Sequence, residues 1–88
     1  MNEPGDLDVT LAKAFCERYA AARAHLLEQM EAAGLTAEAG WRIAESTRTV
    51  QGGMEVVLRP VHRYLQPPEG MECVVSIDVE SFDIETNC

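Results

Sequence analysis

Apolar and polar residues alternate with two different periods along this chain, a helical period first and a strand period afterwards. From Val9 to Ala33, apolar residues recur every three or four positions. This spacing places them along one side of an α-helix and leaves polar residues on the other side. The apolar stripe consists of Leu11, Phe15, Tyr19, Ala22, Leu26, Met30 and Ala33. The pattern predicts one amphipathic helix of about 25 residues.

The residues that flank this segment are typical of helix ends. Asp6 and Asp8 are short acidic residues that can accept the first free amide hydrogens, and the positive end of a helix dipole favours them. Gly34 follows the stripe, at the place where many helices end in a left-handed residue. We therefore expect residues 1–8 to form a flexible N-terminal arm and residues 36–40 to form a connection.

From residue 41 onward the period is two, which is typical of strands. Two such segments, residues 41–51 and 54–65, are separated by Gly52 and Gly53. Both glycines can adopt positive φ without steric cost, and two glycines between alternating segments predict a tight hairpin.

The third alternating segment, residues 71–85, follows a Pro-Pro pair and a glycine within residues 66–70, which cannot continue a strand. Pro60 predicts a bulge or bend in the second strand, because proline cannot donate a hydrogen bond to a neighbouring strand. The expected fold is α+β with two layers: a long N-terminal amphipathic helix packed on a three-stranded antiparallel meander, α-β-β-β. It would occupy residues 9–85 as a single domain, with residues 86–88 as a C-terminal tail.

Charge is distributed unevenly along the 88 residues, whose formal net charge is −8. Residues 1–38 sum to −4, residues 39–68 to +2 and residues 69–88 to −6. An acidic surface repels nucleic acid and anionic membranes and attracts basic partners. We therefore expect neither direct nucleic-acid binding nor membrane binding, and a protein with a basic surface as the partner.

The cysteine spacing and the lengths of the apolar runs indicate the cellular compartment of the protein. Cys16, Cys73 and Cys88 are an odd number without metal-binding or disulfide-framework spacing, which favours a reducing compartment. Cys88 is expected to be the freely reactive thiol, and Cys73 to lie in the core. The sequence shows neither a signal-peptide pattern nor an apolar run long enough to cross a bilayer, so we expect a soluble, cytoplasmic protein.

The last predicted strand is the most acidic part of the chain. Residues 73–85 alternate apolar and polar positions and contain neither Lys nor Arg. Carboxylates two residues apart on one strand face would stand about 6.6 Å apart, a regular acidic ladder suited to a cationic partner. The expected partner-binding acidic residues are Glu72, Asp78, Glu80, Asp83 and Glu85. The alternative is a solvated strand face whose charges discourage aggregation.

Apolar residues fall on both faces of the predicted sheet, although one helix can cover only one of them. On the uncovered face we expect apolar partner-binding residues, rimmed by charges, as protein interfaces commonly are. These are Val57, Val61, Leu65, Val74, Phe82 and Ile84. Such a face could also join two copies of the chain into a homodimer. Alternatively, a bulge near Pro60 or Ser81 would return some of these side chains to the core.

Known catalytic patterns are absent from the sequence. The chain has no phosphate-binding loop and no nucleophile elbow. His25 and His62 lack further ligands at metal-binding spacing, and His62 with Asp78 or Glu80 would be the place to look for a metal. We expect no catalytic residue, no metal site and no cofactor.

Two functions remain in contention at the level of sequence. The first is a small acidic interaction module, an adaptor or inhibitor that binds a basic surface of a partner protein. In the extreme case it would mimic nucleic acid, as a phage-encoded inhibitor of bacterial defence would. The second is a secretion-chaperone-like or adaptor homodimer that uses the apolar sheet face. An enzyme subunit is the least favoured function, because no convergent catalytic constellation is present.

Overall fold

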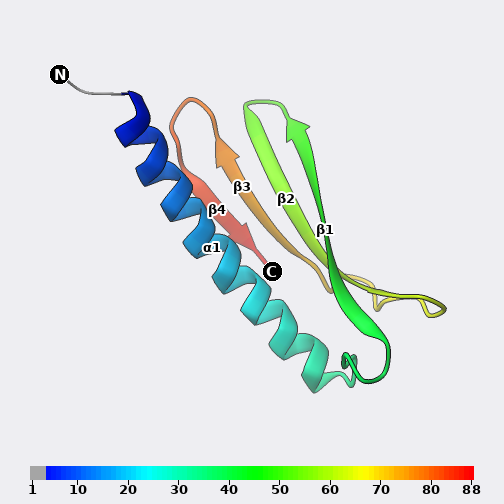
Figure 1. The fold of residues 1–88 in the computed structure, drawn as a ribbon. Helices are drawn as coiled ribbons and strands as arrows, with labels where there is room; N and C mark the ends of the chain where they lie inside the picture. The colour runs from blue at the N-terminus through cyan, green and yellow to red at the C-terminus, as the bar shows by residue number, and fades with distance from the viewer. Residues whose placement is uncertain (1–3) are drawn as a thin grey trace.

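The computed structural model describes the backbone from residue 4 to residue 88 and the side chains from residue 9 onward. One helix is followed by four strands that form a single antiparallel sheet in sequence order (Figure 1). The elements are α1 (Pro4–Ala32), β1 (Trp41–Val50), β2 (Gly53–His62), β3 (Cys73–Asp78) and β4 (Ile84–Asn87). The α+β class is confirmed, but the sheet has four strands where three were expected.

Helix α1 begins earlier than its apolar stripe suggested. It starts at Pro4, and proline suits the first helical position because its φ is already helical and its missing amide hydrogen would be unpaired there. Residues 4–8 are therefore helical and not part of an arm, and Asp6 and Asp8 lie inside the helix and not before it. The rest of the expected arm, residues 1–3, lies outside the described residues.

The end of α1 at Gly34 is confirmed. Gly34 has φ of 80°, and its amide donates to the carbonyl of Glu31 at 3.1 Å. The amide of Leu35 donates to the carbonyl of Met30 at 2.7 Å. This pair of bonds is the Schellman arrangement, which satisfies carbonyls that the last helical turn would leave unpaired.

The helical stripe packs on one face of the sheet, as expected. Ala22, Leu26 and Met30 are buried, and Phe15 and Tyr19 pack against them. The sheet contributes the other half of this core with Trp41, Val56, Leu58, Cys73 and Val75. The core therefore lies between α1 and the middle of the sheet.

The β1–β2 hairpin is confirmed, although its loop lies one residue earlier than expected. Val50 pairs with Gly53, so the two loop residues are Gln51 and Gly52. Gly52 has φ of 85°, whereas Gly53 has no positive φ. Gly53 is instead the first residue of β2, and it also pairs with Asp78 of β3.

The bulge expected at Pro60 is not present. Residues 41–50 pair one to one with residues 62–53, with Pro60 opposite Ile43. The pairing of β2 with β3 ends at Leu58 and Cys73, so Pro60 lies beyond the part of β2 that is paired on both sides. Proline is tolerated there because only one neighbouring strand needs bonds from β2.

The predicted third strand is interrupted by a turn. Strand β3 ends at Asp78, a connection spans residues 79–83, and β4 returns alongside β3 from Ile84. Phe82 in this connection has φ of 60°. Alternating apolar and acidic residues imitate a continuous strand here, but Asp78 and Ser81 are residues whose side chains stabilise turns.

Two cysteines are joined, contrary to expectation. Cys73, fully buried in the core, forms a disulfide with Cys88, and Cys16 on α1 is free and exposed. Residues 86 and 87, expected to belong to a tail, are part of β4. The expectation that Cys88 reacts freely is therefore wrong, because the pairing of β3 with β4 brings it to Cys73.

Candidate functional site: an acidic cluster at one end of the sheet

Four of the five predicted acidic site residues lie together at the β3–β4 turn. Asp78 ends β3, Glu80 and Asp83 lie in the connection, and Glu85 is on β4. We call these four residues the acidic cluster. The turn lies beside the N-terminal half of α1 (Figure 1).

The acidic cluster does not include Glu72, which precedes β3 at the opposite end of that strand. Glu72 is six residue steps from Asp78, which along a strand corresponds to roughly 20 Å. The expected acidic ladder along one continuous strand is therefore wrong, because the chain reverses after Asp78. The reversal gathers Asp78, Glu80, Asp83 and Glu85 into a compact group instead.

Backbone and side-chain hydrogen bonds hold the turn in one conformation. Asp78 Oδ1 accepts from the amides of Glu80 at 2.8 Å and Ser81 at 3.1 Å. The Asp78 amide donates to the carbonyl of Asp83 at 2.9 Å, and the Phe82 amide donates to the carbonyl of Asp78 at 2.8 Å. The Val79 amide donates to the carbonyl of Gly52, which ties the turn to the β1–β2 hairpin.

The same hydrogen bonds set the charge state of Asp78. Two amide groups, from Ser81 and Glu80, point at its carboxylate and lower the pKa of Asp78 below its ordinary value. The effect arises because amide hydrogens stabilise the ionised form. Asp78 is therefore ionised at neutral pH. Its carboxylate accepts the hydrogen bonds that close the turn.

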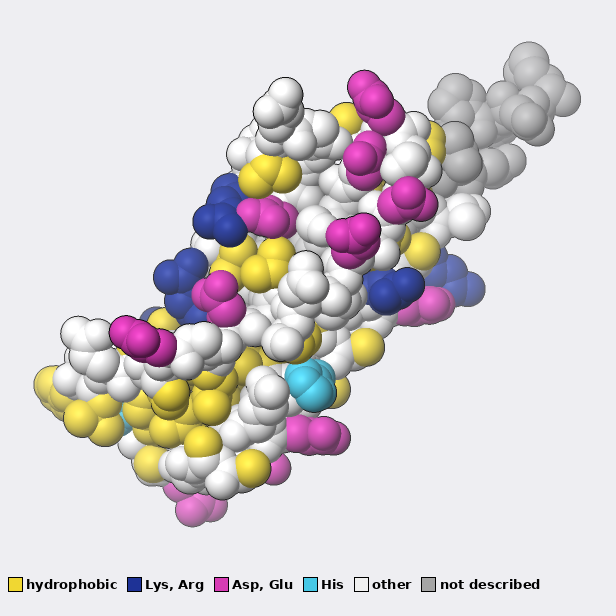
Figure 2. Space-filling model, turned by 180° about the vertical axis from the view of Figure 1, so that it is seen from behind, with side chains coloured by type: hydrophobic (Ala, Val, Ile, Leu, Met, Phe, Trp, Pro, Cys, Tyr) yellow, Lys and Arg dark blue, Asp and Glu magenta, His cyan; other side chains and the backbone are white. Residues whose placement is uncertain are grey.

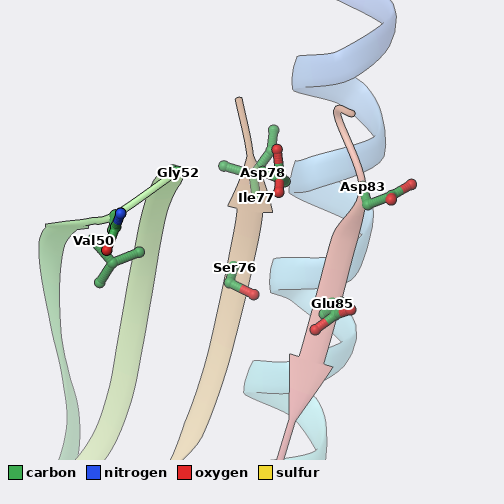
Figure 3. A pocket seen from close by; sticks show the side chains of 9 residues that line it. Val50, Gly52, Ser76, Ile77, Asp78, Asp83 and Glu85 are labelled. Atoms are coloured by element: carbon green, nitrogen blue, oxygen red, sulfur yellow. The ribbon is translucent and has the colours of Figure 1, made fainter. Parts of the chain in front are cut away.

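A shallow pocket lies beside the acidic cluster at the end of β2 and β3 (Figure 3). It has a volume of about 200 Å³. Its lining consists of Val50, Gln51, Gly52, Gly53, Ser76, Ile77, Asp78, Asp83 and Glu85. Ser76 and Glu85 are cross-strand partners and face the same side, whereas the carboxylate of Asp83 points away from β3. Carboxylates and a hydroxyl around an open hollow suit a cationic side chain such as Arg or Lys.

The face of the sheet that points away from α1 is acidic at one end and apolar at the other. Figure 2 shows Asp and Glu side chains gathered at the upper end, toward the β3–β4 turn, and apolar side chains gathered at the lower end. At the acidic end, Arg48 forms an ion pair with Glu55, which stands opposite Ser76 and therefore in the same cross-strand row as Glu85. Because Arg48 and Glu55 balance each other, the acidic cluster supplies the unbalanced charge at this end of the face.

The predicted apolar site residues are dispersed. Val57 and Val74 are cross-strand partners on the face away from α1, but Val57 is only 2% exposed. Val61 is half-buried near the end of β2, and Leu65 is exposed after it. These positions form a smaller accessible surface than the sequence suggested.

The other two predicted apolar residues depart further from expectation. Phe82 is 47% exposed but lies in the β3–β4 turn and not on a strand. Ile84 packs against the core under α1, so its assignment to the uncovered face is wrong. The reason is that the turn resets the alternation of faces, as the bulge alternative near Ser81 had anticipated.

His62 has a structural role at the opposite end of the sheet from the acidic cluster. Its Nδ1 accepts from the amides of Tyr64 at 3.0 Å and Leu65 at 3.1 Å. The ring proton is therefore on Nε2, which donates to the carbonyl of Ala39 at 2.9 Å. His62 pairs with Trp41 and Asp78 with Gly53, so the sheet separates the two residues that a metal would have joined.

Among the described residues, no group of three or more His, Cys, Asp or Glu side chains could hold a metal ion. Within the same part of the chain, no helix has both the length and the apolar character that crossing a bilayer demands. Neither a family model, nor a curated protein, nor a solved structure matches this chain.

Sequence reasoning missed the strand-end residues that complete the pocket. Gly53 and Ser76 line it from β2 and β3, and they are neighbours only because those strands pair. A signal was present in Asp78 and Ser81, whose spacing is that of a side chain closing a turn. Recognising it would have divided the third strand and located the acidic cluster.

Proposed function

We propose that this protein is a small acidic interaction module that binds a basic surface of a partner protein through the acidic cluster. The observation that carries the proposal is the grouping of Asp78, Glu80, Asp83 and Glu85 at one hydrogen-bonded turn beside an open pocket. The hydrogen bonds fix the Asp78 carboxylate and the backbone of the turn, so less conformational freedom is lost when the turn meets Arg or Lys. The proposed role needs neither a cofactor nor a catalytic residue.

Charge supports a basic protein as the partner in preference to nucleic acid. The chain has a formal net charge of −8, which repels phosphates. A protein surface that binds nucleic acid is basic, so this module could occupy such a surface and act as an inhibitor that mimics nucleic acid. An inhibitor of bacterial defence encoded by a phage is one example of that class.

The alternative, a homodimer or chaperone-like adaptor that uses the apolar sheet face, receives less support. Val57, at the centre of that face, is almost fully buried already. Ile84 belongs to the core. An interface usually needs a contiguous accessible patch, and these residues do not provide one.

We place the protein in the cytoplasm as part of the same proposal. The Cys73–Cys88 disulfide argues against this placement, because such bonds persist mainly in oxidising compartments. In a reducing compartment the pair would be present largely as thiols.

The decisive experiment compares two variants with the same net charge. One neutralises the acidic cluster with Glu80→Gln, Asp83→Asn and Glu85→Gln, and it leaves Asp78 to close the turn. The control neutralises three acidic residues elsewhere, with Glu28→Gln, Glu31→Gln and Glu38→Gln. Each variant is used to purify partners from the native host at low and high salt, and captured proteins are identified by mass spectrometry.

A basic partner that binds the unmodified chain and the control, but is lost from the first variant and at high salt, supports the proposal. Equal loss from both variants would show that net charge alone matters. Partners whose binding changes neither with salt nor with any of the six substitutions would contradict the proposal.

A further inference from the structure

An apolar pocket lies on the helix side of the sheet, at the same end as the acidic cluster. It has a volume of about 300 Å³ and opens to solvent between α1 and the ends of β2 and β3. Its lining is apolar throughout and consists of Leu11, Ala12, Phe15, Cys16, Met54 and Ile77. Phe15 also packs against the buried core cluster, so the pocket adjoins the core.

The apolar pocket and the acidic pocket meet at one residue. Ile77 lines both, and Asp78, the next residue, belongs to the acidic cluster. Met54 pairs with Ile77 across β2 and β3, and Gly53 pairs with Asp78. The two pockets are therefore on opposite sides of the same strand end and share Ile77.

Further exposed apolar surface adjoins this strand end. Met54 is 40% exposed, and Val79 and Phe82 in the β3–β4 turn are 58% and 47% exposed. The Val79 amide donates a hydrogen bond to the carbonyl of Gly52. The β3–β4 turn and the tip of the β1–β2 hairpin are therefore joined beside the pocket. Large side chains exposed next to an apolar pocket are a common feature of docking sites.

The charges at this end favour a basic occupant. Glu80, Asp83 and Glu85 are exposed around the turn, and Glu17 lies on the exposed part of α1 close to Cys16 in sequence. Lys13 and Arg18 are basic residues on the same stretch of helix, so the acidic excess at this end comes from the β3–β4 turn. Arg48 does not offset the acidic residues, because it is paired with Glu55.

We propose that a basic, amphipathic segment of a partner protein docks here, with a large apolar side chain in the pocket and Lys or Arg residues against the acidic cluster. This inference rests on the proposed function and deepens it, since it adds an apolar anchor to the electrostatic contact. Buried apolar anchors commonly contribute most of the affinity at an interface, and charges contribute most to association rate and choice of partner.

Cys16 provides a direct report on the pocket, because it is free, exposed and part of the lining. The probes are three synthetic peptides: one with leucines at helical spacing and lysines elsewhere, one with alanines in place of the leucines, and one with glutamines in place of the lysines. Binding is followed by fluorescence anisotropy, and occupancy of the pocket by the rate at which iodoacetamide alkylates Cys16.

The leucine–lysine peptide should bind most tightly and slow the alkylation of Cys16 several-fold. The alanine–lysine peptide should bind weakly, only at low salt, and leave the alkylation rate unchanged. A Cys16→Ser, Ala24→Cys variant carries its thiol at an exposed position about 12 Å further along α1 and should show no protection with any peptide.

Two matched substitutions distinguish the contribution of the apolar pocket from the effect of an added positive charge. Met54→Lys and Leu27→Lys add the same charge at side chains that are 40% and 39% exposed, but only Met54 lines the apolar pocket. Met54→Lys should weaken the leucine–lysine peptide about tenfold, which corresponds to about 1.4 kcal/mol. Leu27→Lys should change its affinity less than twofold.

Equal effects of Met54→Lys and Leu27→Lys, without protection of Cys16, would overturn the anchor and leave the proposed function standing. The proposed function itself fails if neutralising Glu80, Asp83 and Glu85 leaves binding of both lysine peptides unchanged. If Cys16 becomes protected when the protein alone is concentrated, a second copy occupies the pocket and the inference is overturned.

Discussion

Gly53 and Ile77 approach so closely that no side chain fits between them: a Cβ on Gly53 would lie 1.9 Å from the carbonyl oxygen of Ile77. The neighbouring Gly52 has open space around its Cβ position and needs glycine for a different reason, its φ of 85°. The two glycines of the hairpin therefore have separate roles. Gly52 makes the turn, and Gly53 lets β3 pair with β2 at the candidate site.

This difference predicts unequal effects of two alanine substitutions. Gly52→Ala should cost about 1 kcal/mol, the usual penalty for a side chain in the left-handed region. Gly53→Ala should cost about 3 kcal/mol, because backbone must move to relieve the overlap. Urea unfolding followed by circular dichroism measures both. Equal losses in the two variants would show that β3 does not restrict Gly53.

Asp78 should make the stability of the fold depend on acid pH. Hydrogen bonds from Ser81 and Glu80 lower the pKa of Asp78 in the folded protein. Its stabilising contribution is therefore present above the ordinary pKa of an aspartate and is lost as pH falls through the lowered folded value. Asp78→Ala should lower the urea midpoint at pH 7 and flatten the acid dependence. Asp78→Asn, which keeps an acceptor oxygen, should retain part of the stability at pH 7 without the acid dependence.

Tyr19 should produce the opposite dependence at alkaline pH. Its hydroxyl donates to Glu45 of β1, and this hydrogen bond is the main cause that raises the pKa of Tyr19 above its ordinary value. A raised pKa means that the contribution is complete below the ordinary tyrosine pKa and is lost as pH rises through the folded value. Thermal unfolding of Tyr19→Phe between pH 8 and about pH 11 should show less loss of stability than the unmodified protein. An identical alkaline profile would contradict the proposed contact.

Thr86 offers a route to a more stable protein. Its hydroxyl oxygen is buried without a hydrogen-bond partner among the described residues. Valine has the same shape without the hydroxyl, so Thr86→Val removes the cost of an unsatisfied polar atom. The substitution should raise the free energy of unfolding by about 1 kcal/mol. A matched Thr49→Val change on the exposed end of β1 should alter stability much less.

The Cys73–Cys88 disulfide should stabilise the association of β4 with the sheet. It joins residues 15 apart in sequence, and closing a loop of that size stabilises a fold by about 3 kcal/mol. Addition of a dithiol reductant should lower the melting temperature of the unmodified protein but not that of Cys88→Ser. Mass spectrometry after alkylation without reductant should find one modified cysteine, Cys16; modification of all three would contradict the pairing.

Sequence alone determined the elements whose signals are local. The 3.6-residue stripe from Leu11 to Met30 predicted α1 because a helix repeats its buried side within its own length. Gly34 predicted the helix end, and the Gly52-Gly53 pair predicted the β1–β2 hairpin; Gly34 and Gly52 have the positive φ that favours glycine, which is a property of single residues. The sequence also predicted that the last segment is acidic. It did not predict that this segment folds into two strands joined by a turn.

Tertiary structure alone decided where the acidic residues gather and which apolar residues they accompany. Alternation after Asp78 is compatible with either a long strand or a turn, and the pairing of β3 with β4 selects the turn. The same pairing joins Cys88 to Cys73 and directs Ile84 into the core. Position 53 requires glycine, and two pockets meet at Ile77, because strands that are distant in sequence pair with each other. Local patterns specify backbone conformation, whereas contacts between strands depend on how separate segments meet in space.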